Sequence, residues 1–115
     1  MSSSPLTPLV NAFDLTTAWL PLYQVPLTAL RTGIDAATFN NYSGTNVTYS
    51  VRIVQTGVGG TLNELITDKT IRAFASDLSP AIIGQAVIIN GVIEAKCSVN
   101  SAVSVNMTGT VINND

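Results

Sequence analysis

The chain has 115 residues, of which 46% are hydrophobic and only 10% are charged, and its formal net charge is −2. It has no histidine and one cysteine, so it lacks most side chains that transfer protons near neutral pH or hold metals. The five basic residues are scattered singly, so they predict no positively charged patch that could bind nucleic acid or a membrane surface. No apolar run reaches the ~18–20 residues of a membrane-spanning helix. This composition indicates a protein that acts by contact, without enzymatic activity, cofactor or metal.

The size and hydropathy indicate one domain with a partly covered surface. A chain of 12.0 kDa is long enough for a single hydrophobic core. Its mean hydropathy of +0.37 is high for a soluble monomer, whose surface usually carries charge on about a quarter to a third of its residues. Met1–Pro5 lack the basic and apolar segments of a signal peptide, which predicts use without export by the general secretory route. We expect partners, including further copies of the chain, to cover much of the surface.

Residues 1–26 are predicted to form an extended N-terminal arm, followed by a β-sandwich domain over residues 27–115. Four of the five prolines lie in the arm, and proline disfavours helix at its own position and at the residue before. The segment 15–23 can join a sheet edge, where Pro21 is tolerated. The large apolar side chains need either their own domain or a neighbour to bury against. The candidate partner-binding residues are Leu6, Leu9, Val10, Phe13, Trp19, Leu20, Leu22 and Tyr23.

After residue 31 the hydrophobic period becomes two, which is typical of half-buried strands. Clear alternation predicts strands over residues 47–53, 93–99 and 103–111, and shorter strands are expected at 32–40, 70–75 and 86–89. Cys97 and Val99 fall on the inward side of their strand, so the cysteine is predicted to be a small buried hydrophobic side chain.

Turn signals separate these strands. Asn40–Asn46 is a polar turn cluster, Gly57–Gly60 is a flexible turn, and Asp77–Pro80 is a loop. Asn90-Gly91 predicts a two-residue hairpin, because type I′ turns need positive φ at both positions. Thr61–Glu64 resembles the capping box of a short helix. Six to eight short strands and no long helix predict an all-β, antiparallel β-sandwich, jelly-roll-like or immunoglobulin-like.

No constellation of residues predicts catalysis. Without histidine there is no Ser-His-Asp or Cys-His arrangement, and the acidic residues are far apart in sequence. Aromatic side chains could instead hold a sugar, and the candidates are Trp19, Tyr23, Tyr42 and Tyr49. Tyr49 alternates inward and Trp19 belongs to the arm, so Tyr42 is the residue expected to be free.

The order of the strand motifs along the chain resembles that of a known type of protein. Tyr23–Pro26 reads Tyr-x-Val-Pro, Ala37–Asn41 leads into the Asn-rich turn, Val47–Val54 alternates, and Gly91–Ala95 reads Gly-x-Ile-x-Ala. This pattern, over about Leu15–Ile112, resembles small bacteriophage virion proteins of the β-sandwich type. The resemblance implies a capsid decoration or cement protein that binds the major capsid protein or other virion proteins and forms a homo-oligomer. It further implies a place in the virion, which is assembled in the host cytoplasm.

Two alternatives stay open. A head–tail connector, neck or tail/fibre component would have the same fold class and another place in the particle. A small carbohydrate-binding β-sandwich module would belong to a different functional class.

Overall fold

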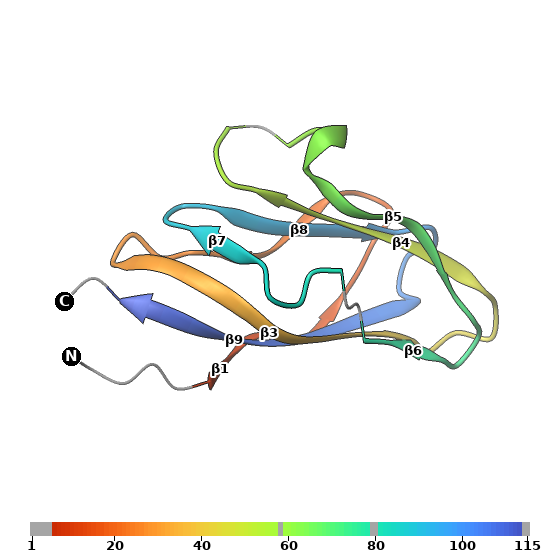
Figure 1. Ribbon diagram of the computed structural model, residues 1–115. Helices are drawn as coiled ribbons and strands as arrows, with labels where there is room; N and C mark the ends of the chain where they lie inside the picture. Colours follow the sequence, from red (N-terminus) through yellow and green to blue (C-terminus); the bar gives the residue numbers. More distant parts are fainter. Residues whose placement is uncertain (1–5, 58, 79–80, 114–115) are drawn as a thin grey trace.

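The computed structural model describes residues 6–57, 59–78 and 81–113, which form two antiparallel sheets packed face to face (Figure 1). Residues 1–5 of the predicted arm, and Ser79 and Pro80 of the predicted loop, lie outside the described residues. The first sheet has the order β1 (Leu6–Asp14), β9 (Val103–Asn113), β3 (Ala29–Asn41) and β6 (Ser76–Asp77), with β7 (Ala86–Ile88) also paired to β3. The second has the order β2 (Leu20–Gln24), β8 (Val92–Cys97), β4 (Val47–Val54) and β5 (Glu64–Ile71). The predicted β-sandwich is confirmed.

The strand connections identify the sandwich as a jelly roll. β1 pairs with β9, β2 with β8, β3 with β6 and β7, and β4 with β5, all antiparallel. When β6 and β7 are counted together as one interrupted strand, each strand pairs with its counterpart from the other end of the chain, as in a long hairpin rolled into two sheets. In an immunoglobulin sandwich the first two strands share a sheet. Here β1 and β2 lie in different sheets.

The core lies between the sheets and follows the alternation seen in the sequence. Phe39 on β3 and Tyr49 on β4 stack across it, with ring centroids 4.5 Å apart and exposures of 0% and 1%. The inward positions of β4, β8 and β9 are buried, while the polar residues between them face out. Cys97 is 4% exposed, as expected.

The predicted arm is built into the sandwich. Its described residues supply the edge strand β1 of one sheet and the edge strand β2, with Pro21, of the other. Val10 is 6% exposed, and Leu9, Phe13, Leu22 and Tyr23 pack against the same core. Leu6, by contrast, is 68% exposed. The apolar side chains of β1 and β2 therefore bury mainly against their own domain, because the first and last strands of a jelly roll must pair.

Two strand ends differ from the prediction. The strand expected at 70–75 begins six residues earlier, as β5 (Glu64–Ile71), and shares only Thr70 and Ile71 with the predicted range. It ends where the buried Asn41 side chain donates hydrogen bonds to the carbonyls of Ile71 (3.0 Å) and Arg72 (3.1 Å). β8 ends at Cys97, so the inward position predicted for Val99 is wrong, and Val99 is 45% exposed. In both cases the chain turns before the hydrophobic alternation ends.

The Asn90-Gly91 signal marks a turn, although the predicted hairpin is wrong. β7 belongs to the first sheet and β8 to the second, so this turn crosses between sheets. Asn90 has a φ of 66°, and the Gly91 amide donates to the carbonyl of Ile88 at 2.8 Å. The predicted short helix is a 3-10 turn, η1 (Thr61–Asn63), preceded by Gly60.

The closure of β1 onto β9 leads to a prediction about two neighbouring glycines. A Cβ on Gly109 of β9 would collide with the carbonyl oxygen of Gly33 and come within 2.6 Å of Leu9 Cδ1, whereas a Cβ on Gly33 would meet nothing within 4 Å. Gly109→Ala should lower the free energy of unfolding by about 1–3 kcal/mol through overpacking. Gly33→Ala should change it by less than about 1 kcal/mol, since only chain entropy is affected. Urea unfolding of both variants tests this, and equal losses would contradict it.

Candidate functional site

The described residues offer no metal centre. They contain no group of three His, Cys, Asp or Glu side chains close enough to hold an ion. Among the same residues, no helix is both long enough and apolar enough to cross a membrane.

Cys97 is placed as a structural thiol. Its Sγ donates to the carbonyl oxygen of Val99 at 2.9 Å, and burial raises its pKa above the ordinary value. Because the thiolate is the reactive form, a raised pKa keeps this sulfur in its unreactive, protonated state at neutral pH.

The loop between β1 and β2 lays Trp19 over the outer face of the second sheet. Arg52 Cζ lies 4.1 Å and Lys96 Nζ 4.9 Å from the centre of the indole ring, both within the range of cation–π contact. The Arg52 Nε donates to Glu94 Oε1 at 2.6 Å, in an ion pair whose two side chains are 14% and 22% exposed. This cluster fixes the loop on the sheet and places the ammonium of Lys96 beside it.

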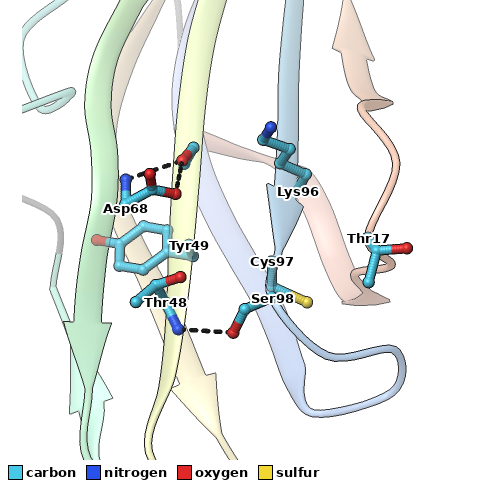
Figure 2. Close-up of a pocket in the computed structure, with 8 residues that line it drawn as sticks. Thr17, Thr48, Tyr49, Asp68, Lys96, Cys97 and Ser98 are labelled. Atoms are coloured by element: carbon cyan, nitrogen blue, oxygen red, sulfur yellow. Dashed lines mark hydrogen bonds between the residues drawn. The ribbon is translucent and has the colours of Figure 1, made fainter.

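A polar trough of about 220 Å³ lies next to this cluster (Figure 2). Going across the sheet, Asp68 comes from β5, Thr48 and Ser50 from β4, and Lys96 from β8. Further lining residues are Thr17 from the β1–β2 loop, Ser98 just after β8, and Tyr49 and Cys97. Figure 2 shows Asp68 and Lys96 on opposite sides of β4.

Hydrogen bonds hold the trough in shape. The Thr48 amide donates to Ser98 Oγ at 3.0 Å, and the Ser98 amide donates to the carbonyl of Thr48 at 2.9 Å. Ser50, 1% exposed, accepts from the Asp68 amide at 2.9 Å, where Asp68 has a φ of 45°. The alternation in the sequence placed Thr48, Ser50 and Lys96 on the outer face. It gave no signal that a kink in β5 would bring Asp68 to them.

A second surface gathers exposed apolar side chains at the end of the sandwich where β2 turns into β3 and β7 into β8, at the left of Figure 1. We call it the apolar end. Leu27 is 76% exposed, and the surface comprises Leu27, Leu30, Ile88 and Ile89. Arg31 pairs with Ile88, and the Asn90 amide donates to the carbonyl of Val25 at 3.3 Å, so the two turns lie side by side. Leu6, opposite Thr110 on β9, is separated from β7 by two strands, so none of the predicted partner-binding residues belongs to this surface.

The aromatic residues considered for sugar binding are spread over the molecule. Tyr49 is in the core, as predicted, and the Tyr23 hydroxyl lies 3.1 Å from the hydroxyl of Thr32. Tyr42 is 43% exposed, but its hydroxyl donates to Asp14 Oδ1 at 2.6 Å, a bond that raises its pKa. Trp19 lies beside the trough through its contact with Lys96.

No protein-family model matches the chain, and no curated protein matches it. Among solved structures, the fold is similar to a chain in the crystal structure of the T13 IBDV viral particle, with a TM-score of 0.57 and 10% sequence identity. The match covers 96% of this chain and 31% of that one, so the present chain spans about a third of the length of its structural neighbour. At this identity the likeness concerns the fold alone.

Proposed function

We propose that the chain is a non-enzymatic virion structural protein. The observation that supports this most is the nested jelly-roll pairing, a topology that recurs in viral capsid domains, together with the likeness to a chain of an icosahedral viral particle. Low charge and the absence of histidine support a role in contacts.

More specifically, we propose a decoration or cement protein of a bacteriophage. It binds the major capsid protein or other virion proteins of the assembled shell and acts as a homo-oligomer. Its place is the virion, after assembly in the host cytoplasm. The strand motifs of the sequence and the exposed apolar end support this proposal.

The edge strands of both sheets carry features that disfavour pairing with another chain, which leaves the apolar end as the contact surface. Exposed edge strands commonly recruit further strands unless proline, bulges or charges prevent it. β1 carries Pro8 and a positive φ of 51° at Ala12, β2 carries Pro21, and β5 is kinked at Asp68, with a φ of 45°. These features disfavour edge-to-edge pairing. Because charge is depleted at the centre of protein interfaces, we assign the shell contact to the apolar end.

A charged substitution at the apolar end tests the proposal. Leu27→Asp should weaken binding to particles that lack the protein by at least about tenfold, because burying a leucine contributes about 1.5–3 kcal/mol. The melting temperature should stay within a few degrees of wild type, since Leu27 is 76% exposed. Co-sedimentation with particles measures the binding.

Phe74→Asp is the matched control, because Phe74 is 74% exposed in the turn between β5 and β6, away from the apolar end. It should bind like wild type. Equal binding by all three proteins would contradict the assignment of the apolar end. Particle stoichiometry tests the function itself: copies far below the number of shell lattice sites would favour a connector, neck or tail/fibre component.

A further inference from the structure

We propose that the trough on the outer face of the second sheet binds one neutral sugar ring of a glycan. This goes beyond the shell-binding role, because the trough lies on the β2-β8-β4-β5 sheet and the apolar end does not line it.

The first reason is a pair of opposite charges available to a ligand. In the described part of the chain, no carboxylate lies within ion-pair distance of Lys96, whose cation contacts the Trp19 ring. The Asp68 carboxylate is contacted by the Ser50 hydroxyl at the long distance of 3.4 Å. Lys96 can therefore donate to ligand oxygens and Asp68 can accept from ligand hydroxyls, in charge-assisted hydrogen bonds. Because the two charges cancel, the site suits a neutral ligand that both donates and accepts.

The second reason is the floor between these charges. It carries the hydroxyls of Thr48 and Ser98, with Thr17 at the side of Lys96. Two hydrogen bonds hold the floor in place before any ligand arrives, one from the Thr48 amide to the Ser98 hydroxyl and one from the Ser98 amide to the Thr48 carbonyl. Preorganised groups of this kind reduce the entropy that a ligand loses on binding. Adjacent hydroxyls on a sugar ring match such a row of donors and acceptors.

The third reason is size and the neighbouring aromatic ring. The trough measures about 220 Å³, below the roughly 300–1,000 Å³ of sites for drug-sized ligands. A single six-membered sugar ring is of the right size. The indole of Trp19 lies beside the trough and holds the ammonium of Lys96 in place at its side.

The test is an NMR titration of the full ¹⁵N-labelled chain with the methyl glycosides of glucose, galactose, mannose and N-acetylglucosamine. At least one should shift the amides of Thr17, Thr48, Asp68, Lys96 and Ser98 in a saturable way. Lys96→Gln and Asp68→Asn should each weaken the affinity by about tenfold or more, because each removes a charge-assisted hydrogen bond. Asparagine tolerates the positive φ of position 68, so the kink of β5 is retained.

Asp35→Asn is the matched control. Asp35 also lies at a strand irregularity and accepts a hydroxyl hydrogen bond, from Thr110 at 2.7 Å, but on the other sheet. It should bind the sugar like wild type, and all three variants should keep the wild-type melting temperature.

Three results would overturn the proposal. They are the absence of saturable shifts with any of the four glycosides, equal weakening by Asp35→Asn, and tighter binding of the zwitterion glycine than of the sugars. Sugar binding and particle attachment are measured separately, so either can fail while the other holds.

Discussion

Phe39→Ala is expected to lower the free energy of unfolding by about 3–5 kcal/mol, the usual cost of removing a large buried aromatic side chain. The ring is fully buried and stacks on Tyr49 with centroids 4.5 Å apart, so its loss leaves a cavity between the two sheets. Because small domains are stable by only about 5–15 kcal/mol, much of the stability should disappear. Urea unfolding followed by tryptophan fluorescence gives the value.

Phe74→Ala serves as the comparison for this measurement. Phe74 is 74% exposed, so its truncation should cost less than about 0.5 kcal/mol. Similar losses for the two variants would show that Phe39 does not form the centre of the core.

Deleting residues 2–10 is expected to destabilise the fold strongly. The prolines of this segment alone predict an arm whose deletion leaves the sandwich folded. In the structure, Leu6–Val10 form the first half of β1 and pair with residues 107–110 of β9. The deletion removes the buried side chain of Val10 and uncovers Met107, which is 2% exposed. The loss of buried apolar surface and of hydrogen bonds should together lower the free energy of unfolding by more than about 3 kcal/mol. Thermal and urea unfolding measure this loss.

Two further proteins separate folding from attachment. A deletion of residues 2–5 keeps β1 (Leu6–Asp14) whole and serves as the reference for the longer deletion. Leu6→Ser should also keep the fold, because this side chain is 68% exposed, and it should bind particles like wild type, because Leu6 lies outside the apolar end. If the deletion of residues 2–10 melts at the wild-type temperature, β1 contributes no stability and the segment acts as an arm after all.

The polar trough shows which part of a site can be predicted from sequence. Thr48, Ser50 and Lys96 alternate with buried neighbours, so their outward position follows from the period of two. Their assembly with Asp68 depends on the β4–β5 register, which is shifted between Tyr49 and Val51. Such a shift arises from tertiary contacts, here the Ser50 hydroxyl that accepts from the Asp68 amide at 2.9 Å. Trp19 likewise reaches the sheet through Arg52, a residue far away in the chain.

The sequence by itself determined the fold class, the inward faces of the main strands and the absence of histidine-based chemistry. These follow from local properties: side-chain alternation, turn residues and composition. Only the tertiary structure decided that the strands pair as a jelly roll, that residues 6–24 complete both sheets, and that Asn90 turns the chain from one sheet to the other. Alternation shows which face of a strand is buried, but it carries no information about the strand that lies beside it. Pairing depends on contacts between residues as distant as Leu6 and Thr110, and these form only when the whole core closes.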